Sequence, residues 1–156
     1  MIIRVNLENV VEAGYVHSIA WQASHKGIVD DNFLITYTPE RQSEYFKKEI
    51  NIDGNEIYIL YNNKLPIGII SLNIPDGEIK SLYVLPEFWG KGYGKYLLDY
   101  GINKLKENRN IFLVVMNINT RARRFYEKNG FIYSGNEKIL SYDKGLGELE
   151  YIYYTK

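Results

Sequence analysis

Helical spacing of apolar residues dominates the first third of the chain. A short strand is expected at Ile2–Asn6. From Glu8 to about Lys26 apolar residues recur at helical intervals, and Gly27 then ends the segment. This segment is therefore predicted to pack as an amphipathic helix. The side chains expected on its inward face are Val11, Tyr15, Ile19 and Ala20.

A second helix is predicted to begin at Thr38. A threonine hydroxyl is a good N-cap, and the ring of Pro39 fits the first helical turn. The apolar stripe of this helix is expected to contain Tyr45, Phe46 and Ile50.

Strand patterns replace helical ones in the middle of the chain. Glu56–Tyr61 and Leu65–Ile74 are predicted to form a hairpin around the short loop Asn62-Asn63-Lys64. A third strand, Glu78–Leu85, follows the turn at Pro75-Asp76-Gly77. These three strands are expected to form a meander.

Helices and strands then alternate to the end of the chain. Ile111–Met116 is continuously apolar, which predicts a strand buried on both faces. Asn119 or Thr120 caps a helix that stops at Asn129-Gly130. The preceding helix, to about Asn108, is expected to bury Leu97, Leu98, Gly101, Ile102 and Leu105. The last strands are predicted at Phe131–Ser134, Lys138–Asp143 and Leu149–Tyr154, joined by glycine turns at Gly135, Gly145 and Gly147.

This order of elements predicts one mixed α/β domain over residues 1–156, because a doubly wound sheet would alternate more regularly. Nineteen basic and nineteen acidic residues balance, which argues against a nucleic-acid surface. The absence of cysteine excludes disulfides, thiolate metal sites and a cysteine nucleophile. No apolar run approaches the ~18 residues of a membrane span. No export signal is visible, so we expect a cytoplasmic protein with neither metal nor membrane partners.

A glycine-rich segment after the third strand carries the clearest chemical signal. Gly90, Gly92 and Gly94 alternate between the strand end at Pro86 and an amphipathic helix. Glycines let a ligand approach the backbone, and a helix N-terminus offers unpaired N–H groups to an anion. The spacing matches neither a P-loop nor a dinucleotide-binding fingerprint. The segment therefore predicts a phosphate site of another kind.

Two motifs in this order resemble the GNAT N-acetyltransferase superfamily. Trp89-x-x-Gly92-x-Gly94 resembles its acetyl-CoA-binding motif, although the first position there is usually Gln or Arg. Asn119–Phe131, with Asn, Ala, Phe-Tyr and Gly-Phe at the family's spacings, resembles the motif that follows. The resemblance covers about Glu56 to Tyr133. It implies a mostly antiparallel central sheet with helices on both faces and a splayed pair of middle strands.

The resemblance also implies acetyl-CoA as co-substrate. Main-chain N–H groups of the glycine loop would hold the pyrophosphate, so an indole at Trp89 is compatible with binding, while simple packing of the ring explains it as well. Lys91 and Lys95 either pair with phosphate charges or are only solvated. Asn119 either contacts the cofactor or only caps its helix. The residues assigned to acetyl-CoA are Leu82, Tyr83, Val84, Trp89, Gly90, Lys91, Gly92, Tyr93, Gly94, Lys95, Asn119, Tyr126 and Lys128.

Acetyl transfer from a thioester to an amine requires an oxyanion donor, a base for the amine and a proton for the leaving thiolate. The resemblance implies that the Val84 N–H contacts the oxyanion and that the Tyr126 hydroxyl reaches the sulfur. Glu78 stands where some superfamily members place a catalytic glutamate, and burial would raise its pKa toward a useful value. Structural explanations stay open for both side chains: an aromatic core pair of Phe125 and Tyr126, and an exposed turn carboxylate at Glu78.

The acceptor amine is the open part of the prediction. A small-molecule primary amine that attacks directly in a ternary complex is expected. Both motifs also resemble bacterial spermidine/spermine acetyltransferases, which favours a polyamine. The acidic residues available near the expected entrance are Glu12, Asp30, Asp31 and Glu78. His17 and His25 share a helix face that can line the pocket. The competing predictions are acetylation of protein N-termini or ribosomal proteins, and a CoA-binding module without turnover. Tyrosine-rich late strands also allow pairing in a homodimer.

Overall fold

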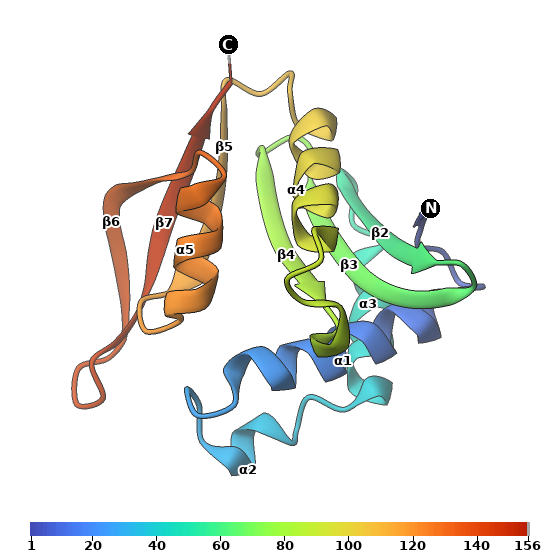
Figure 1. Cartoon of the computed structure of the whole chain (residues 1–156), viewed down its shortest axis with the longest axis horizontal. Helices are drawn as coiled ribbons and strands as arrows, with labels where there is room; N and C mark the ends of the chain where they lie inside the picture. Colours follow the sequence, from blue (N-terminus) through green and yellow to red (C-terminus); the bar gives the residue numbers. More distant parts are fainter. Residues whose placement is uncertain (156) are drawn as a thin grey trace.

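The computed structural model describes residues 1–155, and its elements follow the predicted order (Figure 1). One short helix, α2, lies in a segment that was expected to be a loop, and a 3-10 turn at Pro86–Phe88 precedes the glycine loop. The elements are β1 (Ile2–Arg4), α1 (Val10–His25), α2 (Asp31–Leu34), α3 (Pro39–Glu49), β2 (Asn55–Asn62), β3 (Leu65–Asn73), β4 (Glu78–Val84), α4 (Tyr93–Lys104), β5 (Asn110–Met116), α5 (Thr120–Lys128), β6 (Ile132–Ser141) and β7 (Leu146–Tyr154).

Local capping determines where two of these helices begin. The Thr38 hydroxyl accepts a hydrogen bond from the Arg41 N–H at 3.1 Å, and Pro39 occupies the first position of α3. The Asn119 side chain accepts from the Ala122 N–H at 3.2 Å at the start of α5. Both starts were predicted, because a cap depends on neighbouring residues alone.

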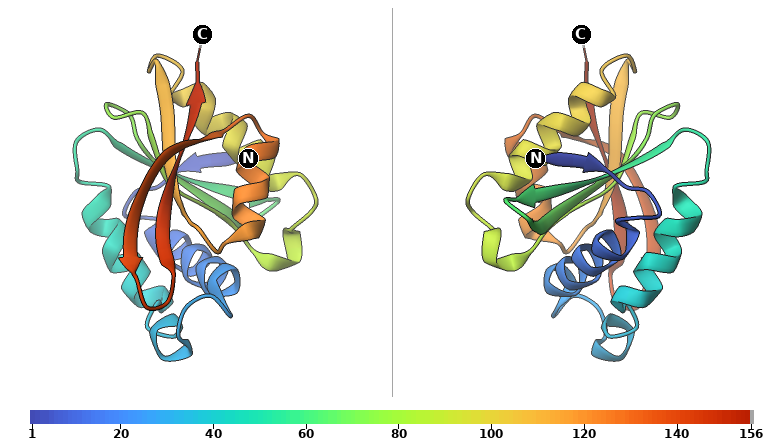
Figure 2. Two further views of the ribbon diagram at one scale, coloured as in Figure 1. Left: turned by 90° about the vertical axis from the view of Figure 1, so that its left-hand side faces the viewer. Right: turned by 90° about the vertical axis from the view of Figure 1, so that its right-hand side faces the viewer.

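All seven strands form one sheet in the order β1-β2-β3-β4-β5-β7-β6. Every neighbouring pair is antiparallel except β4 and β5, which are parallel. Helices α1 and α3 pack on one face of the sheet, and α4 and α5 lie on the other (Figure 2). The predicted mixed α/β fold, mostly antiparallel with helices on both faces, is confirmed.

The two parallel strands separate almost at once. Glu78 opposite Phe112 is their one paired position, and the Phe112 N–H donates to the Gly77 carbonyl at 3.0 Å. Beyond this point β4 stays paired with β3, whereas β5 pairs with β7 along its whole length. The sheet therefore opens between β4 and β5 toward Val84 and Met116, as Figure 1 shows. The splay implied by the family resemblance is present.

The inward face of α1 differs from the prediction. Val11, Tyr15 and Ile19 are 67%, 46% and 37% exposed. A Cβ built on Gly14 would lie 2.1 Å from the Ser43 hydroxyl oxygen, so α1 and α3 approach too closely for large side chains. A glycine and a serine therefore meet where the two helices approach each other, and α1 turns the face with Val11, Tyr15 and Ile19 toward solvent. The buried positions of α1 are Val10, Ala13, Gly14, Val16, His17, Ser18, Ala20, Trp21 and His25.

Two predictions for the second half also need correction. β5 is buried on one face only, because the core beneath α1 and α3 contains no residue of β5, β6 or β7, and Val114 is 49% exposed on that side. Gly135 does not end a strand: with a φ of +93° it lies in an irregular stretch inside the continuous strand β6. Among residues 1–155, no helix is both long and apolar enough to cross a membrane.

Candidate active site

The glycine loop leads into α4 with its N–H groups free. Gly90 and Gly92 have φ values of +71° and +89°, which side-chain-bearing residues rarely adopt. Side chains cap α2, α3 and α5, but none caps α4, whose first backbone bond is from the Tyr96 N–H to the Gly92 carbonyl. The unpaired N–H groups of this first turn and the positive end of the helix dipole make an anion site.

Trp89 joins the glycine loop to both sides of the opening. Its indole N–H donates to the Val84 carbonyl at 2.7 Å. The Arg121 guanidinium, from the first turn of α5, lies 3.5 Å from the centre of the indole ring. This stacking gives the Trp89 ring a packing role, which the sequence alone left undecided. It also adds Arg121 to the residues around the opening. Because Arg121 lies two positions after the predicted Asn119, the second motif contained the signal for it.

The Val84 N–H points into the opening of the sheet. In an antiparallel ladder, the N–H and C=O groups of successive residues turn alternately toward the two edges of the strand. The Leu85 N–H donates to the Ile67 carbonyl on β3 at 2.8 Å. The main-chain groups of Tyr83 therefore also face β3. Those of Val84 and Leu82 face the other edge of β4, with which β5 does not pair.

Tyr126 approaches this region from α5. Its ring is buried and lies edge-on to Phe125 and Phe131, with centroids 5.2 and 5.7 Å away. Burial raises the pKa of its hydroxyl, which therefore keeps its proton at neutral pH. Every fully buried side-chain nitrogen or oxygen in residues 1–155 has a partner, yet this hydroxyl has none there, so it keeps contact with solvent. Phe125 packs against Gly94, at the start of α4.

Glu78 lies at the closed end of the splay. It is half-buried, and desolvation raises the pKa of its carboxyl, with the Lys80 charge opposing that shift. Lys80 itself bonds to the buried carboxylate of Glu49 at 2.5 Å. Six residues of extended strand separate Glu78 from Val84, or about 20 Å. The two groups therefore cannot touch the same acetyl group.

The predicted lysines have other partners in the structure. The Lys95 ammonium forms an exposed ion pair with Asp99 at 2.7 Å. The Lys91 ammonium lies 5.6 Å from the centre of the Phe88 ring. Lys128 is in the last turn of α5, at the opposite end of that helix from Asn119. These contacts leave the assignment of the three lysines to the cofactor a prediction, and the main-chain N–H groups of the loop remain the strongest candidate for an anion site.

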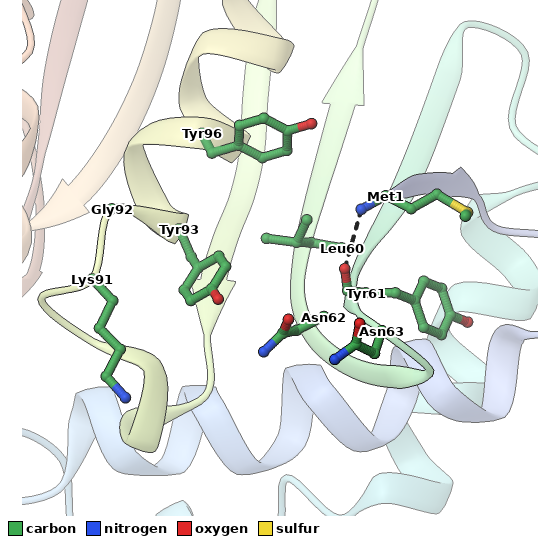
Figure 3. Close-up of a pocket in the computed structure, with 9 residues that line it drawn as sticks. All are labelled: Met1, Leu60, Tyr61, Asn62, Asn63, Lys91, Gly92, Tyr93 and Tyr96. Carbon is green, nitrogen blue, oxygen red and sulfur yellow. Dashed lines mark hydrogen bonds between the residues drawn. The ribbon is translucent and has the colours of Figure 1, made fainter.

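A hollow of about 390 Å³ lies on the flank of the glycine loop that faces the β2–β3 hairpin (Figure 3). Lys91, Tyr93 and Tyr96 line one side, and Met1 and Asn62 belong to the other. It contains none of the residues of the splay, so the opening between β4 and β5 is a separate feature.

The part of α1 that approaches β4 is rich in aromatic contacts. Trp21 stacks on Tyr37 with ring centres 3.6 Å apart, and on His25 with centres 4.2 Å apart. The ring of His17 meets that of Tyr83 edge-on at 5.2 Å. Both histidines, expected from the sequence to share a face, are buried and converge on Tyr83.

Comparisons with known proteins agree with this geometry. Residues 27–131 match the model of the acetyltransferase (GNAT) family. An uncharacterized N-acetyltransferase of Archaeoglobus fulgidus is 31% identical over 115 residues, which cover 66% of this chain and 76% of that protein. The PaiA N-acetyltransferase of Thermoplasma acidophilum, solved in complex with coenzyme A, has a TM-score of 0.82 at 23% identity and covers 99% of this chain and 98% of its own. Spermidine N-acetyltransferase SpeG of Vibrio cholerae has a TM-score of 0.67 at 17% identity, with 99% and 94% covered.

The family model matches most of the chain, and the splay, the uncapped start of α4 and the second motif stand where the family resemblance places the cofactor. The co-substrate is therefore acetyl-CoA. The chain belongs to the GNAT family and is an acetyl-CoA-dependent N-acetyltransferase.

Proposed function

We propose that this enzyme transfers the acetyl group of acetyl-CoA to a primary amine of a small molecule, by direct attack in a ternary complex. The observation that carries the proposal is the opening between β4 and β5. There the Val84 N–H lies on an edge of β4 that pairs with no other strand. An extended pantetheine arm pairs with such an edge as another strand would. The uncapped start of α4 then receives the pyrophosphate.

The reaction assigns a role to each group around the opening. The amine nitrogen attacks the thioester carbon, and the Val84 N–H stabilises the oxyanion that forms. The C–S bond breaks with its electron pair on sulfur, and Tyr126 donates a proton to the thiolate. The proton lost by the amine passes through water to Glu78, because the raised pKa makes its carboxylate a stronger proton acceptor than an ordinary glutamate.

A polyamine is the acceptor that the surroundings favour. The face of β5, β7 and β6 opposite the core beneath α5 holds a hollow of about 380 Å³. Three carboxylates and one lysine give it a net negative charge, and the exposed Val114 supplies apolar contact. SpeG, which shares the fold, is by name a spermidine N-acetyltransferase. The hollow is lined by Val114, Asn136, Glu137, Lys138, Glu148 and Glu150.

An acetylation screen tests the proposal. Release of free CoA thiol is measured with acetyl-CoA and each of spermidine, spermine, an aminoglycoside, free amino acids and N-terminal peptides. Spermidine is expected to be acetylated with a higher kcat/KM than any peptide, with the product confirmed by mass spectrometry. Preferred turnover of an N-terminal peptide would show that the acceptor is a protein and not a small molecule. Binding of acetyl-CoA without turnover of any amine would overturn the proposal.

A further inference from the structure

His25, the last residue of α1, has a tautomer that its surroundings determine. Its Nδ1 lies 2.9 Å from the Trp21 carbonyl oxygen. A carbonyl oxygen only accepts hydrogen bonds, so Nδ1 must carry the proton and Nε2 must carry a lone pair. Burial also lowers the pKa of His25, and the ring is therefore neutral at pH 7.

The lone pair on Nε2 of His25 is free. Nε2 has no hydrogen-bond partner among residues 1–155, and every fully buried side-chain nitrogen or oxygen there has one. The residue as a whole is only 6% exposed, so His25 is buried while this nitrogen keeps some contact with solvent. His17 differs, because its Nδ1 lies 2.8 Å from the Gln42 amide nitrogen and already accepts that hydrogen bond.

The position of His25 places its ring near Tyr83, on the strand that borders the opening of the sheet. Its ring centre is 6.3 Å from that of Tyr83, the residue next to Val84 on β4. In Figure 1 the C-terminal end of α1 lies below the gap between β4 and β5. Burial raises the pKa of Tyr83, and the nearby Tyr126 adds to that shift. Tyr83 is thus a neighbour both of His25 and of the residue proposed to protonate the thiolate.

We propose that Nε2 of His25 contacts the attacking amine of the acceptor and accepts its proton as the C–N bond forms. This inference rests on the proposed function. The amine donates its electron pair to the thioester carbon, the C–S bond breaks toward sulfur, and the amine proton moves to Nε2. The Trp21 carbonyl holds Nδ1–H throughout. Water then carries the proton from Nε2 toward Glu78 and bulk solvent.

The groups around His25 suit a transient rather than a permanent positive charge. Trp21 stacks on its ring from α1, Tyr83 faces it from β4, and Tyr37 lies behind Trp21. His17 is the nearest other titratable base, and burial lowers its pKa to about 4, so it is neutral as well. No carboxylate contributes to the pKa of His25. An imidazolium formed here is therefore not stabilised and loses its proton readily.

Two substitutions separate proton transfer from packing. His25→Phe keeps an aromatic ring against Trp21 and removes both nitrogens, so kcat/KM for spermidine is expected to fall about 100-fold or more. The Kd of acetyl-CoA is expected to stay within about twofold, because no cofactor residue changes. His25→Gln restores an oxygen that accepts a hydrogen bond but does not take the proton. Its KM for spermidine is expected to stay near that of the wild type while kcat remains low.

A labelling experiment tests the free lone pair without any turnover. Diethyl pyrocarbonate attacks exposed, unprotonated imidazole nitrogens, and the chain has two histidines. Mass spectrometry of the wild type is expected to show modification of His25 and not of His17, with protection by spermidine and CoA together. Preferential labelling of His17 would overturn the inference. If the wild type acetylates spermidine and His25→Phe does so equally fast, the inference is overturned and the proposed function survives. A wild type that acetylates no amine would instead refute the proposed function.

Discussion

At the scale of single residues, Trp89 shows how one side chain can serve two elements. Its N–H completes the hydrogen bonding of the Val84 carbonyl, and its ring supports the Arg121 guanidinium. Guanidinium–indole contacts of this kind contribute about 0.5–2 kcal/mol, depending on their exposure. Glutamine or arginine is usual at this position in the family, so the indole is this chain's own way to connect the loop with α5.

Replacement of Tyr126 by phenylalanine isolates the role of its hydroxyl. The buried ring and its contacts with Phe125 and Phe131 remain, so the fold and the acetyl-CoA site are unchanged. We expect kcat to fall about 100-fold or more, because the thiolate loses its proton donor. The Kd of acetyl-CoA, measured by calorimetry, is expected to change little. An unchanged kcat would exclude Tyr126 as the acid.

Glu78→Gln is expected to stabilise the protein at neutral pH. Burial raises the folded-state pKa of Glu78 above its ordinary value of 4.5, so the folded state binds the proton more tightly than the unfolded state does. Stability is then lost as the pH rises through the folded pKa. In urea unfolding, the variant and the wild type should have equal free energies of unfolding at about pH 4. At about pH 8 the variant should have the higher free energy of unfolding. A variant destabilised equally at both pH values would contradict this.

Glu78→Gln also has a kinetic consequence. Only the ionised carboxylate accepts a proton, so wild-type activity should increase as the pH rises through the raised pKa. The variant is expected to lack that part of the pH–rate profile. An identical pH–rate profile in the variant would show that another group causes the rise in activity with pH.

At the scale of elements, the strand–loop–helix from β4 to α4 provides the anion site through its backbone. Gly92 adopts the left-handed region at the N-cap of α4, and nothing lies within 4 Å of a Cβ built there. A side chain at this position is therefore strained in its backbone but not crowded. Its tip is free to project into the space that the pyrophosphate would occupy.

Gly92→Ala and Gly92→Glu form a matched pair at this site. Both substitutions carry the same left-handed strain of about 1–2 kcal/mol, so their thermal stabilities should be similar. Only the glutamate adds an anion beside the phosphates, and it should weaken acetyl-CoA binding by more than ~100-fold relative to the alanine variant. Calorimetric titration measures both affinities. Equal affinities of the two variants for acetyl-CoA would show that the phosphates do not bind at this loop.

At the scale of the whole molecule, the splay opens the sheet between β4 and β5, while the core beneath α4 and α5 continues across both parts. α1 and α3 cover the strands up to β4, whereas β5, β7 and β6 extend beyond them. One residue pair joins the two parts along the β4–β5 line. The edge of β4 therefore stays unpaired inside a sheet, and a ligand with amide groups can complete it.

Amide hydrogen exchange should report this free edge residue by residue. Tyr83 and Leu85 face β3 and should exchange slowly with or without ligand, because their N–H groups are already bonded. Leu82 and Val84 face the opening and should exchange faster in the free protein. Acetyl-CoA should then slow these two amides. Slow exchange at Val84 in the free protein would show that its N–H is not available.

The sequence predicted features that depend on near neighbours and missed those that depend on packing. The caps at Thr38 and Asn119 were correct, since each uses residues within one turn. The buried face of α1 was wrong, because the approach of Gly14 to Ser43 is a contact between two helices. Arg121 was overlooked because its partner, Trp89, lies 32 positions earlier in the chain.

By itself, the sequence determined the order of elements, the anion-binding loop and, through two motifs in series, the family and its co-substrate. These follow from local backbone preferences and from spacings within one segment. The tertiary structure alone decided which way the Val84 N–H points and that Trp89 joins three elements. It also decided that His25, with its free nitrogen, lies near Tyr83. Each of these depends on strand register or helix packing, which bring together groups that no local pattern connects.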